Sequence, residues 1–97
     1  MIVRIMGEGQ YRLTDDVRTR VNDLDNECVA AVERGDADAF ARAFAQLLDL
    51  VRNDGEHLPD EDLEASDVIV PPGDTTMDEV AGDFSGEGLF PEPAGSA

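Results

Sequence analysis

The chain has 97 residues, which is enough for one small domain, and its formal net charge is −16 at pH 7. A single cysteine excludes an internal disulfide, and no apolar run approaches the roughly 20 residues that cross a bilayer. Direct binding to nucleic acid or to an anionic membrane surface requires clustered Lys or Arg, and this sequence has no Lys and a large acidic excess.

The first thirteen residues predict a β-hairpin. Apolar side chains dominate residues 1–6, and residues 10–13 alternate between polar and apolar. Gly7 and Gly9 lie between these runs, and glycine supplies the positive φ that such a short turn needs. The alternative is a single strand that bends at a bulge at one of the two glycines.

Residues 14–52 predict two amphipathic helices joined by a break at residues 34–36. Thr14 and Asp36 are natural N-caps, and Gly35 suits the left-handed conformation that ends a helix. So short a connection makes the helices antiparallel neighbours. The predicted apolar stripes are Val17, Val21, Leu24, Cys28 and Val32 in the first helix, and Phe40, Ala43, Phe44, Leu47, Leu48 and Val51 in the second.

The first helix also carries many polar residues away from its apolar stripe. Asn22 and Asp25 are among them, and we expect this side of the helix to face water. Asp16 and Arg20 lie one turn apart, where an exposed ion pair contributes only a few tenths of a kcal/mol.

The segment after the second helix predicts an acidic loop and then a third strand. The second helix should end at residues 53–55, and Leu58 and Leu63 would pin the loop that follows. Residues 66–72 predict the strand through their β-branched run, and Pro71 and Pro72 suit an edge position because they cannot extend a ladder.

These elements predict an α+β fold. We expect a small three-stranded antiparallel sheet, made of the N-terminal hairpin and a strand near residues 67–70, packed against the antiparallel helical hairpin. The side chains that should point from the second helix toward Ile5 and Ile69 are Phe40, Phe44, Leu47 and Leu48.

The C-terminal part predicts a short helix and a tail. A capping box, either Thr75 with Asp78 or Thr76 with Glu79, opens the helix, whose apolar residues are Met77, Val80 and Phe84. Leu89 and Phe90 form an apolar pair just before Pro91, and they either pin the tail onto the core or remain available to another protein. We expect one domain at residues 1–91 and a disordered tail at residues 92–97.

No residue pattern in the sequence predicts a catalytic, cofactor-binding or metal-binding site. His57 is the single histidine and reads as a solvated loop side chain, and Cys28 reads as a buried structural thiol. The carboxylates of residues 60–64 lack the spacing of a calcium loop, and no cysteine or histidine spacing fits zinc. The glycines of residues 7–9 lack the lysine and the helix of a phosphate-binding loop.

The negative charge is concentrated in the C-terminal half. Residues 1–52 hold ten acidic side chains and all seven arginines, whereas residues 53–97 hold thirteen acidic side chains and no basic one. Such a distribution would steer a basic protein partner toward the chain. It also fits a salt-rich cytoplasm or a simple solvated tail. A salt-adapted protein should gain stability strongly between low and molar salt, so salt-dependent unfolding separates these readings.

Several segments resemble, in their order and spacing, the PspA-associated protein family (PspAA). They are residues 1–11 (MIVRIMGEGQY), 58–63 (LPDEDL), 66–72 (SDVIVPP), 74–80 and 87–91. The resemblance implies a small cytoplasmic accessory protein that works with PspA, the phage-shock protein of the envelope-stress response. Members of the family occur in actinobacteria and archaea, and the acidic excess fits a salt-loving archaeon, with a high-GC actinobacterium as the alternative.

We therefore expect a non-enzymatic adaptor that binds a PspA-like protein and reaches the inner face of the membrane through it. Phe84, Leu89 and Phe90 are the predicted partner-binding residues. The alternative hypothesis is an acidic inhibitor that mimics nucleic acid and occupies a basic DNA-binding regulator. That mimic requires carboxylates spaced like phosphates on a rigid face, whereas an adaptor needs an apolar centre.

Overall fold

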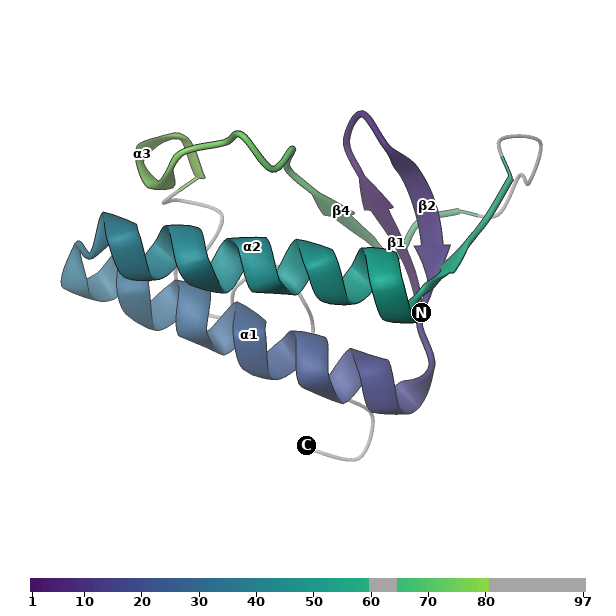
Figure 1. Cartoon of the computed structure of the whole chain (residues 1–97). Helices are drawn as coiled ribbons and strands as arrows, with labels where there is room; N and C mark the ends of the chain where they lie inside the picture. Colours follow the sequence, from purple (N-terminus) through teal and green to yellow (C-terminus); the bar gives the residue numbers. More distant parts are fainter. Residues whose placement is uncertain (60–64, 81–97) are drawn as a thin grey trace.

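In the computed structural model, a pair of long antiparallel helices lies across one face of a four-stranded sheet (Figure 1). The structure describes residues 1–59 and 65–80. In chain order the elements are β1 (Ile2–Ile5), β2 (Gly9–Arg12), α1 (Asp15–Arg34), α2 (Ala37–Asp54), β3 (Glu56–His57), β4 (Val68–Val70) and α3 (Met77–Val80).

The predicted N-terminal hairpin is confirmed. β1 and β2 pair antiparallel, from Ile2 opposite Arg12 to Ile5 opposite Gly9. Gly7 and Gly9 have φ angles of 86° and 119°, which a side chain with a Cβ rarely adopts. The turn therefore depends on both glycines.

The predicted three-stranded antiparallel sheet is wrong in strand number and in the direction of one strand. The sheet has the order β3-β2-β1-β4, and β4 pairs parallel to β1. The additional strand, β3, lies at residues 56–57, where we expected a loop, and it pairs with β2. The edge position of β4 is confirmed.

The parallel direction of β4 constrains the path of the chain. β3 lies at one edge of the sheet and β4 at the other, and both run in the direction of β1. The chain between them must therefore cross the width of the sheet and also return along the length of the strands before β4 begins. A run of three β-branched residues has the same pattern in either direction, so the sequence does not reveal this connection.

The predicted helix caps are confirmed. They could be predicted because each depends on contacts within a few residues. Val17 N–H donates to Thr14 Oγ1 at 3.3 Å, and Ala39 N–H donates to Asp36 Oδ1 at 3.0 Å. Gly35 has a φ of 70° and closes α1. The capping box at α3 uses Thr76 and Glu79, with Thr76 N–H donating to Glu79 Oε1 at 3.1 Å.

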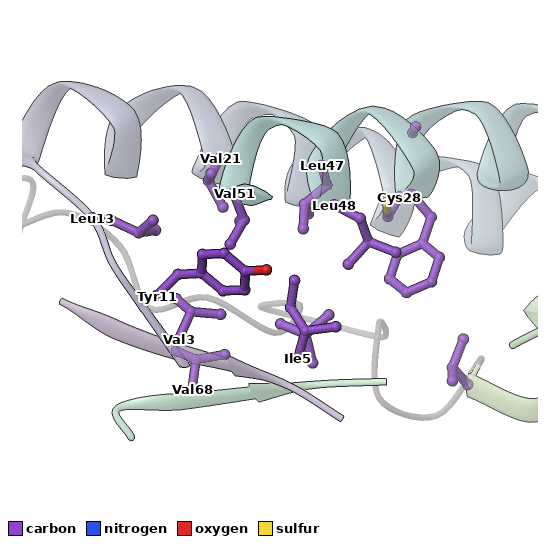
Figure 2. Packing of buried hydrophobic residues seen from close by; sticks show 14 of the residues in the cluster. Val3, Ile5, Tyr11, Leu13, Val21, Cys28, Leu47, Leu48, Val51 and Val68 are labelled. Atoms are coloured by element: carbon purple, nitrogen blue, oxygen red, sulfur yellow. The ribbon is translucent and has the colours of Figure 1, made fainter. Parts of the chain in front are cut away.

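The hydrophobic core lies between the helical hairpin and one face of the sheet (Figure 2). Val3 and Ile5 are fully buried in it, and Tyr11, Val68 and Val70 join them from the neighbouring strands. All six residues of the predicted α2 stripe are buried, namely Phe40, Ala43, Phe44, Leu47, Leu48 and Val51.

One expected core residue points the other way. Ile69 is 57% exposed, whereas its neighbours Val68 and Val70 are buried. Successive side chains of a strand alternate between faces, so the burial of both valines turns Ile69 away from the helices. Of the two sheet residues expected to face α2, only Ile5 does so.

Helix α1 is more buried than its pattern predicted. Val17, Val21 and Cys28 are buried as expected, and Leu24 and Val32 are partly buried. Asn22 and Asp25 were expected to face water, but they are 7% and 0% exposed. Burial depends on tertiary neighbours, and the spacing of apolar residues within one helix does not predict which neighbours will cover its polar side.

Two contacts fix the C-terminal end of α2 against the β1–β2 hairpin. Arg52 Nε donates to Glu8 Oε1 at 2.7 Å, and a second bond joins the same two side chains. Gly55, which follows α2, packs so closely that a Cβ there would lie 2.9 Å from Leu13 Cδ2. Glycine is required at this position because there is no room for a Cβ, and not because the backbone has a positive φ.

Candidate partner-binding groove

The outer side of the helical hairpin is hollowed between α1 and α2. The core residues of α2 face the sheet, and the residues one to two positions away around the helix line this hollow. Its volume is about 480 Å³ and its lining comprises Arg20, Asp23, Leu24, Gln46, Asp49, Leu50, Asn53 and Asp54.

A second hollow continues the first toward the loop that joins the helices. Its volume is about 280 Å³ and it shares Gln46 with the first; its other lining residues are Glu27, Ala30, Arg34, Ala39, Arg42 and Ala43. We call the two hollows together the interhelical groove. From Arg20 to Arg34 along α1, it is about 21 Å long at 1.5 Å per residue, or about four helical turns. Figure 1 shows the two helices side by side over this length.

The interhelical groove carries apolar side chains among its polar and charged ones. Leu24 and Leu50 are partly buried side chains that pack against the core from its outer side. Ala30, Ala39 and Ala43 line the other half, and their small side chains let a neighbouring backbone approach closely. Gln46, in the middle, is exposed.

The two ends of the groove carry opposite charge. Asp23, Asp49 and Asp54 line one end together with Arg20, whose Nη1 lies 2.8 Å from Asp54 Oδ2. Asp49 Oδ1 also lies 3.4 Å from Arg52 Nη1.

The end near the interhelix loop is lined by Arg34 and Arg42 with one carboxylate, Glu27. Arg34 Nη2 is 3.8 Å from Asp36 Oδ2, a weak exposed pair. The groove is therefore net negative at its leucine end and net positive at its alanine end.

The opposite surface of the molecule also exposes apolar side chains. Met6 is 51% exposed and Ile69 is 57% exposed, and Arg4 pairs with Ile69 on the same face. We call Arg4, Met6 and Ile69 the outer sheet face. Beside them, Gln10 is buried and its Nε2 donates to Ser66 Oγ at 2.7 Å. This contact covers the adjacent part of the face.

The edge at β4 offers few backbone groups for pairing. Met6 N–H donates to Val70 O at 3.0 Å, so in this parallel pair the N–H and C=O of Ile69 point away from β1. β4 has only three residues, and Pro71 and Pro72 follow at once. Short strands and prolines are features that keep sheet edges from pairing with other chains.

A sequence model of the PspA-associated protein family (PspAA) matches residues 1–92. The chain belongs to this family. The match confirms the resemblance, and the family's name states an association with PspA. No curated protein and no solved structure gives a significant match to the chain.

The partner-binding residues predicted for this PspAA member, Phe84, Leu89 and Phe90, lie outside the described residues, as do residues 92–97. The structure brings together a different set in the interhelical groove. The sequence carried a weak signal for it: Leu50 and Ala39 border the main stripe of α2 and make it wider than one buried face requires.

The side chains considered for chemistry in this PspAA chain lie on different elements. His57 lies on β3, which corrects its loop position, and its exposed ring packs against Tyr11 with the centroids 5.0 Å apart. Cys28 is fully buried, and desolvation, with Asp25 and Glu27 nearby, raises the pKa of its thiol to about 12. Among residues 1–59 and 65–80, no group of three or more His, Cys, Asp or Glu side chains could hold a metal ion.

The carboxylates of residues 60–64 lie outside the described part of the chain. None of the described helices is both long and apolar enough to cross a bilayer.

Proposed function

We propose that this protein is a non-enzymatic accessory protein of the PspA system and that it acts by binding a PspA-like protein. The observation that carries the proposal is the PspAA match, which covers nearly the whole chain. The high negative charge supports it as well, because such a charge speeds encounter with a basic partner surface and disfavours wrong partners.

The state of the nucleophilic and basic side chains supports a binding role over a catalytic one. A thiol whose pKa is about 12 carries almost no thiolate at neutral pH, so Cys28 is a poor nucleophile. His57 contacts an aromatic ring and lies at a sheet edge. Neither the groove nor the outer sheet face brings these two residues together.

The protein would work on the cytoplasmic side and reach the inner face of the membrane through its partner. Anionic lipid headgroups attract basic segments, and a chain of net charge −16 without lysine gains nothing from them. Recruitment by a membrane-associated partner removes the need for a direct contact.

The alternative, an acidic mimic of nucleic acid, has less support. It requires an uninterrupted face of carboxylates, but arginines lie among the acids of both long helices. Arg20 and Arg52 neutralise Asp54 and Glu8 in close ion pairs, and Arg34 and Arg42 form a positive end of the groove.

A titration against the PspA-like protein encoded in the same genome tests the proposal. Isothermal titration calorimetry at low and at molar salt should give saturable binding, with the weaker binding at molar salt if charge steers the encounter. His57→Ala should bind as the wild type does. Absence of binding at both salt concentrations would contradict the proposal, and displacement of DNA from a basic regulator would favour the mimic.

A further inference from the structure

We propose that the interhelical groove is the surface that binds the partner, and that its occupant is a single amphipathic helix of that partner. This inference rests on the proposed function and names the contact surface and the shape of the bound segment. The bound helix would carry an apolar stripe, with basic residues at one end and acidic residues at the other.

The shape of the groove suits a helix. Two antiparallel helices form a straight channel between their side chains, and a third helix packs into it as helices pack in bundles. About four turns of a partner helix fit along the length from Arg20 to Arg34. Leu24 and Leu50 offer apolar contacts at one end, and the alanines let the partner's backbone approach at the other.

The charges of the groove select the occupant and its direction. The carboxylates of Asp23 and Asp49 complement basic side chains of a partner helix, and Arg42 complements an acidic one. Only one orientation of the helix satisfies both ends, because the reversed helix brings like charges together. A second copy of this chain is a poor occupant, since each copy carries a net charge of −16.

The rival surface is the outer sheet face together with the sheet edge at β4, and its geometry is less suitable. Ile69 presents one outward pair of backbone groups, and the prolines after β4 prevent the edge from extending. A strand added there would gain few hydrogen bonds. The groove, at about 21 Å, is about twice as long as the three-residue strand, which spans about 10 Å.

A bulky side chain in the middle of the groove tests the proposal without disturbing the core. Gln46 is exposed and lines both hollows, so Gln46→Trp should fill the channel and weaken binding of the PspA-like protein roughly tenfold or more. Ala45→Trp is the matched control, because Ala45 is exposed on the same helix and does not line the groove. Circular dichroism should show both variants folded.

A charge reversal provides the second, independent variant. Asp23→Lys should weaken binding severalfold and reduce its salt dependence, whereas Glu33→Lys makes the same change on an exposed part of α1 outside the lining and should not. Light scattering of the isolated chain should show no change of oligomeric state in any variant.

The outcomes separate the inference from the function on which it rests. If the wild type binds and the groove variants bind equally well, the groove is not the site and the proposed function stands. If the wild type does not bind, the inference about the groove and the proposed function both fail. If Gln46→Trp dissociates an oligomer of the isolated chain, the occupant is a second copy, which also overturns the inference.

Discussion

The interhelical groove and the outer sheet face lie on opposite sides of the same core, and they expose apolar atoms in different ways. The outer sheet face has the more exposed side chains, Met6 and Ile69, but Met6 follows the end of β1 and Ile69 lies in a strand of only three residues. The groove has only partly buried leucines, yet it extends over about four helical turns and carries charge at both ends. We therefore propose the groove on the grounds of its length and charge pattern and not on the exposure of single apolar residues.

The largest effect is expected at the core that supports both surfaces. Leu47 is fully buried between α2 and the sheet, so Leu47→Ala should cost about 2 to 5 kcal/mol in the free energy of unfolding through lost burial and the cavity left behind. Urea denaturation measures this cost. A loss as small as that of an exposed substitution would show that α2 does not pack on the sheet.

A smaller loss in the free energy of unfolding is expected where α2 meets the β1–β2 hairpin. Gly55→Ala places a Cβ against the Val51 carbonyl and Leu13, and it should cost about 1 to 3 kcal/mol. Gly73→Ala is the control, because its Cβ would meet no backbone atom and only the side chains of Leu48, at 3.2 Å, and Arg52, at 3.6 Å. A stabilised Gly55→Ala variant in the same urea series would disprove the close packing at this corner.

A still smaller, pH-dependent effect on the free energy of unfolding is expected from the ion pair of Arg52 and Glu8, which fixes α2 to the β1–β2 turn. The hydrogen bonds of Arg52 lower the pKa of Glu8 below its ordinary value of 4.5. The pair therefore stabilises the fold fully above the ordinary pKa of the carboxyl group. This stabilisation is lost as the pH falls through the lowered pKa of Glu8.

Both side chains of this pair are about a third exposed, so Glu8→Gln should cost at most about 1 kcal/mol at neutral pH. Unfolding of the wild type and of Glu8→Gln from about pH 7 down to about pH 3 should show the difference shrinking toward acid. A difference that grows in acid would have the wrong sign for this account.

The smallest effect is expected on the outer sheet face. Ile69→Thr keeps a β-branched residue on β4 and leaves the core untouched, so it should change the free energy of unfolding by no more than about 0.5 kcal/mol. Binding of the PspA-like protein should also be unchanged. Loss of binding in this folded variant would move the contact surface from the groove to the sheet.

Much of the fold follows from local features of the sequence. The caps at Thr14, Gly35 and Asp36 rely on bonds within four residues, and the α2 stripe rotates in step with one helix, so both were predictable. The hairpin turn required positive φ at its glycines, which the residue type alone indicates.

The remaining features depend on contacts between distant segments. The parallel direction of β4 depends on its pairing with β1, which is distant in the chain, and a symmetrical run of valine and isoleucine does not encode it. The burial of Asp25 and the exposure of Ile69 likewise depend on which tertiary neighbours cover them. The groove needs both helices at once, so neither helix pattern predicted it alone.

A methyl-resolved NMR titration of this chain with the unlabelled PspA-like protein tests the central claim most directly. The account predicts that intermolecular contacts and the largest shift changes fall on the methyl groups of Leu24 and Leu50, while those of Met6 and Ile69 stay unchanged. Shift changes confined to Met6 and Ile69 would contradict it.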